Sequence, residues 1–252
     1  MKQILKGAGF PVLDYVWFTR GELGTAREEI IAKIEKKIKY PAFVKPATLG
    51  SSIGVSRANN REELDKAIDL AASYDHRILV EVGINNPVEI NCAALGYGAD
   101  VMASVCEMPV PSTGDKFLNF FEKYLRNASA KGESSRGMKS LSRVVPAPIG
   151  DELTQRIQKM TREIFRLLDG RGTMRIDFIL DENDMLYVNE PNTIPGSLAF
   201  YLWKECGVSF SDLVDKMVEG ALRAHADKNQ NVYAFDSTIL QKVASGVKGA
   251  KR

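Results

Sequence analysis

The sequence predicts an α+β fold, in which strands are grouped into hairpins and separated by amphipathic helices. Two stretches, residues 88–108 and 172–197, alternate apolar and polar side chains as strands do, and each contains a turn signal. Residues 150–170 instead repeat apolar side chains every three or four positions, which is the spacing of a helix. The strands and helices do not alternate strictly, so a parallel sheet is not predicted.

The first third of the chain contains short elements with clear boundaries. Gly7 and Gly9 end a first helix, and Asn60 is a suitable N-cap for a later one. In order, this part predicts a helix over 2–8, a strand near 12–18, a helix over 26–38, strands near 42–45 and 55, a helix over 60–75 and a strand over 77–83.

The rest of the chain contains two hairpins, two helices and one long polar stretch. Residues 116–143 have no clear periodicity, and a loop of this length in a compact domain is usually a lid or a binding loop. In order, this part predicts a hairpin over 88–108 turning at Gly96–Gly98, the polar stretch, a helix over 150–170, a hairpin over 172–192, a helix from Ser211 and a weakly patterned tail over 226–252.

The composition excludes several classes of function. The 252 residues carry a net charge of +2, which gives no global attraction to nucleic acid or to an anionic membrane. The three cysteines are far apart in sequence and odd in number, so we expect neither a disulfide framework nor a zinc site, and a reducing compartment fits best. No apolar run approaches the length of a membrane span, and no signal peptide is recognisable. We therefore expect a soluble cytoplasmic protein.

The second hairpin has polar side chains where a core hairpin would have apolar ones. With Glu182–Asn183 as a two-residue turn, Arg175 would lie opposite Glu190. Alternation would then place Arg175, Asp177, Glu190 and Asn192 on one face of the sheet, together with Val188. Carboxylate and amide oxygens are ligands that Mg²⁺ prefers, and an arginine beside them can neutralise a phosphate or an oxyanion. From these residues alone, a metal site and an ordinary cross-strand Arg–Glu pair are about equally supported.

Three further segments have side chains suited to a nucleotide. In "FVKPATLGSSIGV", Lys45 precedes a Gly- and Ser-rich turn that can present N–H groups to phosphates. In "LVEVGINNPVE", Glu81 can accept an adenine amino proton and Glu89 can accept ribose hydroxyls. In "FFEKYL", Lys123 is flanked by aromatic residues within the long loop. Each segment alone also fits a plain polar turn or a solvated charge, and no GxGxxG or GxxxxGK[ST] motif is present.

Taken together and in this order, "FVKPATLGSSIGVS", "EKYL", "RIDF" and "NEPNTIPG" resemble the ATP-grasp family of D-alanine–D-alanine ligases. The resemblance covers residues 1 to about 225. It implies ATP as a substrate, two Mg²⁺ ions (with Mn²⁺ as an alternative), D-alanine as the other substrate and, commonly, a homodimer. The nucleotide residues that it implies are Lys2 and Lys45 at phosphates or adenine, Ser51, Ser52 and Gly54 in the phosphate-covering loop, Glu81 and Ile84 at the adenine hinge, and Glu89 at the ribose.

The resemblance also implies the residues that carry the chemistry and the division into domains. The catalytic residues implied are Lys123 and Tyr124 in a lid loop over 116–143, Asp177, Glu190 and Asn192 as Mg²⁺ ligands, and Arg175 with the Gly196 amide as the groups that stabilise a tetrahedral intermediate. The expected subdomains are residues 1–88 in the centre of the fold and 89–225 as the catalytic part, followed by the tail.

Three features depart from the family pattern. A domain of about a hundred residues precedes residue 1 in the family, and its glutamate grips the first D-alanine, so we expect this chain alone to ligate poorly or not at all. The segment "PGSLAFYLW" is shorter than usual, so the serine that binds the second substrate cannot be assigned, although Ser197 is a substitute. The lid stretch is longer than usual.

Other interpretations therefore stay open beside a dipeptide ligase. One is a D-alanine ligase with another second substrate, such as D-lactate or D-serine. Another is a nucleotide-binding module without turnover, and a third is a structural protein without a nucleotide site.

Overall fold

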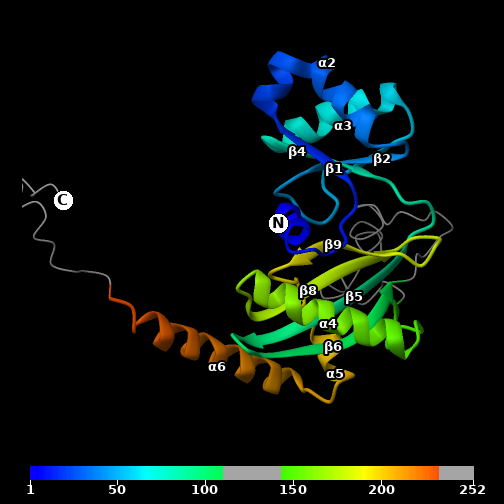
Figure 1. The fold of residues 1–252 in the computed structure, drawn as a ribbon. Helices are drawn as coiled ribbons and strands as arrows, with labels where there is room; N and C mark the ends of the chain where they lie inside the picture. The colour runs from blue at the N-terminus through cyan, green and yellow to red at the C-terminus, as the bar shows by residue number, and fades with distance from the viewer. Residues whose placement is uncertain (110–142, 233–252) are drawn as a thin grey trace, which may run out of the picture.

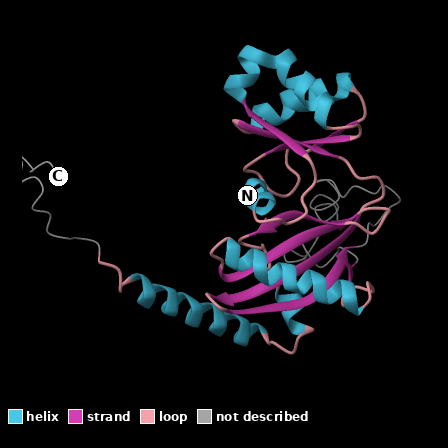
Figure 2. Ribbon diagram, in the orientation of Figure 1, coloured by secondary structure: helices cyan, strands magenta, loops and turns pink. Residues whose placement is uncertain are grey.

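Two antiparallel sheets, one above the other in Figure 1, make up the body of the molecule. The structure is a computed structural model that describes residues 1–109 and 143–232. Helices lie on the outer side of the first sheet and on both sides of the second, as Figure 2 shows. The α+β class predicted from the sequence is confirmed.

The first sheet has four strands in the order β1-β4-β2-β3. Alternate residues such as Val44, Ile78 and Val80 are buried against the helices α2 and α3. The opposite face of the same strands therefore points toward the second sheet. The elements of this half are β1 (Tyr15–Thr19), α2 (Arg20–Lys37), β2 (Ala42–Pro46), β3 (Ser56–Ala58), α3 (Arg61–Tyr74) and β4 (Arg77–Val82).

Helix α2 begins six residues earlier than the predicted start at residue 26. Its first turn is held by a capping box, in which Thr19 accepts from the Glu22 N–H and Glu22 accepts from the Thr19 N–H. Ala26 interrupts the helix with φ −138° and ψ 37°. The apolar periodicity begins only after this kink, which is why the sequence pattern missed the first turns. By contrast, the predicted N-cap Asn60 is confirmed, since it accepts from the Glu63 N–H at 2.9 Å.

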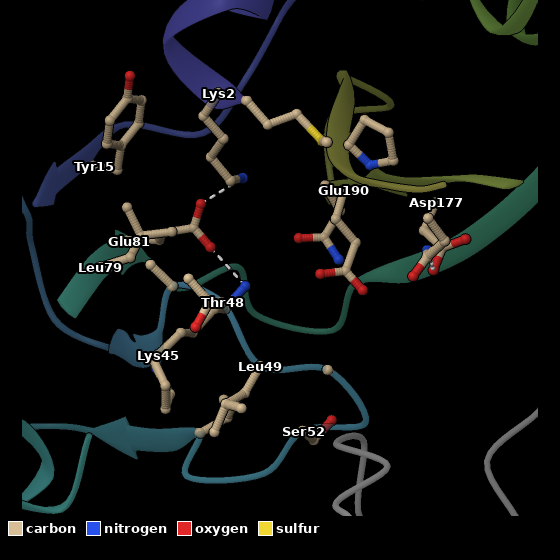
Figure 3. Close-up of a pocket in the computed structure, with 18 of the residues that line it drawn as sticks. Lys2, Tyr15, Lys45, Thr48, Leu49, Ser52, Leu79, Glu81, Asp177 and Glu190 are labelled. Atoms are coloured by element: carbon tan, nitrogen blue, oxygen red, sulfur yellow. Dashed lines mark hydrogen bonds and ion pairs between the residues drawn. The ribbon is translucent and has the colours of Figure 1, made fainter. Parts of the chain in front are cut away.

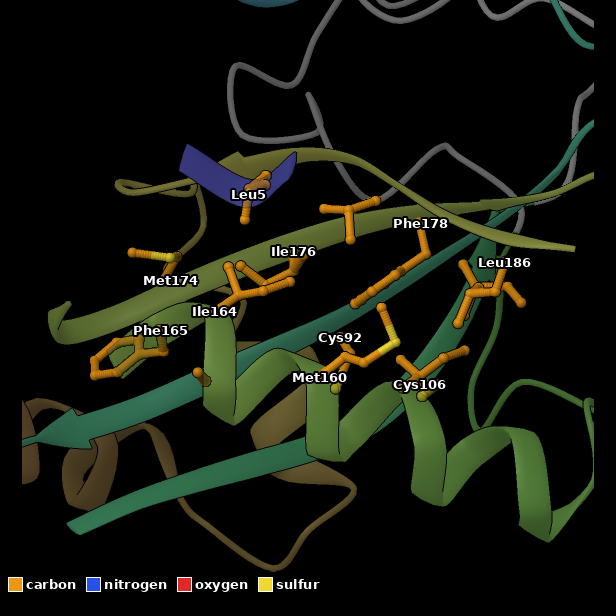
Figure 4. Packing of buried hydrophobic residues seen from close by; sticks show 14 of the residues in the cluster. Leu5, Cys92, Cys106, Met160, Ile164, Phe165, Met174, Ile176, Phe178 and Leu186 are labelled. Atoms are coloured by element: carbon orange, nitrogen blue, oxygen red, sulfur yellow. The ribbon is translucent and has the colours of Figure 1, made fainter. Parts of the chain in front are cut away.

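The second sheet has five strands in the order β7-β6-β5-β8-β9. Helix α4 packs on one face, where Ile157, Ile164 and Phe165 meet the inward residues of the strands (Figure 4). Helices α5 and α6 cover part of the other face through Trp203 and Leu213. The elements of this half are β5 (Val88–Tyr97), β6 (Asp100–Pro109), β7 (Arg143–Val144), α4 (Asp151–Leu167), β8 (Arg171–Leu180), β9 (Leu186–Asn192), α5 (Phe200–Lys204) and α6 (Phe210–Lys228).

The sequence did not predict two short elements, β7 and α5. A two-residue strand has no periodicity of its own, and β7 exists only through its pairing with the end of β6. Helix α6 extends to Lys228, so the predicted tail begins inside it. Every helix in the described part of the chain is too short or too polar to span a bilayer.

The first helix, α1 (Lys2–Gly7), belongs by packing to the second half of the molecule. Leu5 is completely buried in the core under β8 and β9, although it lies in the segment 1–88 that was expected to form the first subdomain. Residue 88 itself is the first residue of β5. Helix α1 therefore connects the two halves, and its side chains reach the space between them.

The turn between β5 and β6 provides a test of this fold. Gly96 has φ +152°, and a Cβ at this position would lie 2.0 Å from the Asp100 carbonyl oxygen. We expect Gly96→Ala to lower the free energy of unfolding by about 3 kcal/mol, measured by urea denaturation, because the backbone must shift. Gly98→Ala is the control: it has φ +59° but nothing within 4 Å, and should cost about 1 kcal/mol. Equal losses in the two variants would contradict the prediction.

Candidate active site

A cleft of about 900 Å³ lies between the two sheets (Figure 3). Strands of the first sheet, the turn between β2 and β3, and helix α1 form one wall. Strands β8 and β9 form the opposite wall. The cleft therefore brings together residues that are up to about 190 positions apart in the sequence, such as Lys2 and Asn192.

The first wall contains a buried carboxylate held between two lysines. Glu81 on β4 is 1% exposed and forms ion pairs with Lys2 of α1 and with Lys45 of β2, the latter at 2.5 Å between Oε2 and Nζ. Figure 3 shows the three side chains meeting on the side of the cleft opposite Glu190 and Asp177. Burial alone would raise the pKa of Glu81, but the ammonium groups of Lys45 and Lys2 lower it. Glu81 is thus a carboxylate, with both oxygens directed at lysines.

The two lysines differ in their electrostatic surroundings. Burial lowers the pKa of Lys2, and the attraction of Glu81 only partly opposes this, since Lys45 repels the Lys2 ammonium. Burial also opposes the charge on Lys45, but there Glu81 outweighs it and the pKa is raised. One carboxylate between two ammonium groups leaves an excess of positive charge at the end of the cleft. Such a place attracts phosphate.

The turn between β2 and β3 borders the same wall. Ser51 and Ser52 line the cleft and have left-handed backbones, with φ of 56° and 59°. Gly54 does not line it but allows the turn to close, because a Cβ there would lie 2.8 Å from a carbon of Pro46. Successive N–H groups in such a turn form a concave surface that suits an anion.

A buried aspartate fixes the start of this turn. Both the N–H and the hydroxyl of Thr48 donate to Asp75 Oδ2 at 2.7 Å, and the Arg77 N–H donates to Oδ1 at 3.1 Å. Burial would raise the pKa of Asp75, but these hydrogen bonds lower it to about 2. Neither Thr48 nor Asp75 was identified from the sequence, because the contact joins the turn after β2 to the loop after α3.

Asp75 should make the stability of the protein depend on acidity. A depressed carboxyl pKa stabilises the folded state above the unfolded value of 3.8, and this contribution is lost as pH falls toward 2. We expect Asp75→Asn to lose up to about 2 kcal/mol at pH 7, with the difference from wild type shrinking steadily below about pH 4 as pH falls through about 2. Urea denaturation across this pH range checks the result, with the exposed Asp100→Asn as the control. A difference that stays constant with pH would contradict the prediction.

The opposite wall is the hairpin of β8 and β9, whose register differs from the predicted one. Arg175 lies opposite Asn192, and Asp177 opposite Glu190, so the predicted pairing of Arg175 with Glu190 is wrong. The turn spans residues 181–185 instead of two residues. A bulge then inserts Asn189, which moves Val188 to the buried face opposite Phe178. Together the longer turn and the bulge shift the register by two residues, which preserves the alternation, so the four polar residues still share one face.

Arg175 and Asp177 form a tight pair on this face. The guanidinium donates to both carboxylate oxygens, from Nε to Oδ1 at 2.6 Å and from a terminal nitrogen to Oδ2 at 2.8 Å. The Asn192 amide donates to Oδ2 at 2.9 Å. Burial would lower the pKa of Arg175, but the negative charge of Asp177 raises it. This arginine therefore keeps its positive charge while partly desolvated.

The residues on this wall fit a magnesium ion that also binds phosphate. No group of three or more His, Cys, Asp or Glu side chains that could hold a metal occurs within residues 1–109 and 143–232. Mg²⁺, however, is usually held by one or two carboxylates together with substrate phosphates. Asp177 and Glu190 supply two carboxylates at directly opposed positions, and both line the cleft with Asn192.

Of the other predicted site residues, some line the cleft and others do not. Glu89 lines the cleft, whereas Ile84 and Gly196 do not. Lys123 and Tyr124, and most of the predicted lid, lie outside the described residues. Further lining residues that sequence reasoning missed are the apolar or aromatic Tyr15, Trp17 and Leu79. The alternation of "YVWF" predicts that Tyr15 and Trp17 lie on one face of the strand. It does not predict which face of the strand meets a ligand.

Antiparallel sheets that enclose a cleft in this way define the ATP-grasp class of folds. The chain belongs to the D-ala D-ala ligase C-terminus family, whose sequence model matches residues 4–219. It is 35% identical over 239 residues to a D-alanine–D-alanine ligase of Thermosipho africanus, which covers 95% of this chain and 61% of the relative. It is 39% identical over 235 residues to one of Thermoanaerobacter sp., covering 90% and 60%.

Solved structures of similar proteins agree with this fold. The VanG D-Ala:D-Ser ligase of Enterococcus faecalis matches with a TM-score of 0.69 and 30% identity, covering 86% of this chain and 59% of the other. The D-alanine–D-alanine ligase of Coxiella burnetii matches with a TM-score of 0.71 and 23% identity, covering 98% and 60%. The chain thus spans about 60% of the length of the curated relatives named above.

Proposed function

We propose that this chain carries the nucleotide site and catalytic residues of an ATP- and Mg²⁺-dependent ligase that joins two D-alanines through an acyl phosphate. The observation that carries the proposal is the arrangement across the cleft. The lysine pair around Glu81 faces the carboxylates Asp177 and Glu190. A volume of about 900 Å³ is in the range of sites for nucleotide-sized ligands. The names of the relatives point to the same reaction.

The nucleotide would lie along the first sheet. Lys2 and Lys45 would turn from Glu81 to the phosphates, and the turn with Ser51 and Ser52 would cover them. The face formed by Tyr15, Trp17 and Leu79 offers an apolar surface for the adenine ring. Beside it, Glu81 and Ile84 would form the adenine hinge and Glu89 would accept ribose hydroxyls.

The reaction proposed has two steps. A carboxylate oxygen of the first D-alanine attacks the γ-phosphorus, and the bond to the ADP oxygen breaks. The amine of the second D-alanine then attacks the acyl carbon, phosphate leaves, and the amine loses a proton. Arg175, charged and partly desolvated, would stabilise the oxyanion together with the Gly196 N–H.

Asp177, Glu190 and Asn192 would hold magnesium on the second wall. Bound there, magnesium would neutralise charge on the phosphate oxygens. In the structure, Arg175 and Asn192 keep the Asp177 carboxylate oriented by three hydrogen bonds. Before substrate binds, the role of Arg175 and Asn192 is therefore to hold the Asp177 carboxylate in a fixed position.

A D-alanine ligase with a different second substrate is the alternative that a specific observation favours. The 30% identical structural relative is a D-Ala:D-Ser ligase. In either form we propose a cytoplasmic enzyme of peptidoglycan precursor synthesis, with a homodimer as the expected assembly.

Phosphate release with ATP and Mg²⁺ tests the proposal. Release that requires D-alanine, with the dipeptide as product, supports it, and a preference for D-serine as second substrate supports the alternative. Tight nucleotide binding without D-alanine-dependent release would leave only a nucleotide-binding module. If saturating ATP and Mg²⁺ do not raise the melting temperature, the nucleotide site itself is refuted, because a ligand of the native state must stabilise it.

A further inference from the structure

A buried carboxylate on the second sheet has no part in the proposed chemistry. Glu107 on β6 is 2% exposed. It lies opposite Asn91, which lies opposite Asp177, which lies opposite Glu190, so the four residues form one row across β6, β5, β8 and β9. The row begins with Glu107 and ends in the cleft with Asp177 and Glu190. Burying a carboxylate costs free energy unless hydrogen bonds compensate. The hydrogen-bond partners of Glu107 therefore indicate which elements it holds in place.

Glu107 is held by three side chains from three other elements. The Tyr201 hydroxyl on α5 donates to Oε1 at 2.6 Å, and the Asn91 amide on β5 donates to the same oxygen at 2.9 Å. Arg143 on β7 lies 3.4 Å from Oε2 and stacks over the Tyr201 ring at 4.2 Å from its centre. The short, charge-assisted bond to Tyr201 is the strongest of these contacts.

Tyr201 anchors a helix that directly follows a strained turn. Leu198 and Ala199 have left-handed backbones, with φ of 53° and 52°, although neither is glycine. Such residues persist only where the surroundings fix them. Ala199 is fully buried, and the Thr173 hydroxyl donates to the Leu198 carbonyl at 3.5 Å. Helix α5 begins at the next residue, so the Tyr201 bond holds the far side of the turn.

The same turn carries the groups that would meet substrate. It includes Gly196, whose N–H is proposed as an oxyanion donor, and Ser197. The Ser197 hydroxyl oxygen is buried and has no hydrogen-bond partner in the described part of the chain. The turn follows Asn192, which lies opposite Arg175. Arg175 donates to Asp177, which lies in the same row as Asn91 and Glu107, so the row connects the arginine to the Glu107–Tyr201 pair.

We infer that Glu107 and Tyr201 are positioning residues for the substrate side of the site: their buried hydrogen bond fixes the turn at residues 195–199 beside Arg175. This inference rests on the proposed function, since it assigns the turn to the bound D-alanines. Lys45, Glu81 and the Ser-rich turn of the nucleotide side belong to the first sheet, whereas Glu107 and Tyr201 belong to the second half of the molecule. Weakening the anchor should therefore affect D-alanine and leave ATP unaffected.

The test uses the full chain with Tyr201→Phe, Glu107→Gln and the control Tyr97→Phe. Tyr97 also donates a phenol hydrogen to a carboxylate, Asp227 at 3.0 Å, but this exposed pair joins β5 to α6 and does not involve α5. Hydrogen exchange is followed by mass spectrometry. We expect amides of residues 197–202 to exchange about tenfold faster in Tyr201→Phe. Glu107→Gln, which keeps an acceptor oxygen, should have a smaller effect, and Tyr97→Phe none. Residues 47–56 should exchange as in wild type in every variant.

Steady-state phosphate release gives the second measurement. We expect the KM for D-alanine to rise about tenfold in Tyr201→Phe, with the KM for ATP within twofold of wild type. Unchanged exchange at the turn overturns the inference, and so does an equal rise in both KM values, which would indicate a general structural role. If wild type shows no D-alanine-dependent release, the melting temperature with ATP and Mg²⁺ still tests the nucleotide site, and the exchange comparison alone decides whether the anchor fixes the turn.

Discussion

Replacing Asp177 with asparagine is expected to lower D-alanine-dependent phosphate release about a thousandfold. The carboxylate accepts two hydrogen bonds from Arg175 and one from Asn192. An amide has only one acceptor oxygen, and its NH₂ group would face one of these donors. The substitution also removes a proposed magnesium ligand. Steady-state phosphate release measures the effect, and the Mg²⁺ concentration needed for half-maximal stabilisation by ATP should rise in parallel.

Asp184→Asn is the matched control in the same hairpin. Asp184 is exposed in the turn and has φ +57°, a backbone conformation that asparagine adopts readily. We expect its activity and melting temperature to match wild type. Activity in Asp177→Asn within tenfold of this control would remove Asp177 from the proposed magnesium site.

Replacing Glu81 with glutamine is expected to lower the free energy of unfolding by about 3–5 kcal/mol at neutral pH. The variant would leave the Lys2 and Lys45 ammonium groups facing each other without a carboxylate between them. Their side chains are 13% and 24% exposed, so water compensates only in part. Urea denaturation measures the loss. Saturating ATP and Mg²⁺ should recover part of it, because phosphates would supply the missing negative charge.

Glu62→Gln provides the control for a surface ion pair. Glu62 pairs with Lys66 one helical turn away, and both side chains are more than 70% exposed. Such pairs contribute little, so a loss of less than about 0.5 kcal/mol is expected. If Glu81→Gln destabilises the protein no more than Glu62→Gln, the lysine pair does not depend on Glu81.

The polar face of the second hairpin could be predicted from the sequence, whereas its register could not. Alternation along β8 fixes Arg175 and Asp177 on one side of the sheet regardless of the partner strand. The register depends on how the turn at residues 181–185 closes and on the bulge at Asn189. Neither has a sequence signal as strong as the strand pattern, and the assumed two-residue turn was therefore wrong.

Contacts between elements that are far apart in the sequence were the other feature of the site that could not be predicted. Lys45 and the Ser-rich turn follow from one continuous motif, but the pairing of Glu81 with both lysines needs α1 to lie across the cleft. Local sequence patterns also did not predict the hydrogen bonds of Thr48 to Asp75 and of Tyr201 to Glu107, because each bond joins segments that are far apart in the chain. The role of a buried polar residue can be inferred only when its hydrogen-bond or ion-pair partners are known.

Helix α1 is held by different forces on its two sides. Leu5 packs in the apolar core of the second half, whereas Lys2 forms an ion pair with Glu81 of the first half. The two main apolar clusters share no residue in the described part of the chain. Packing thus fixes α1 to one half and charge fixes it to the other. In the proposed function, a polyanion in the cleft would compete with Glu81 for Lys2, so ligand binding and the connection between the halves would depend on the same ammonium group.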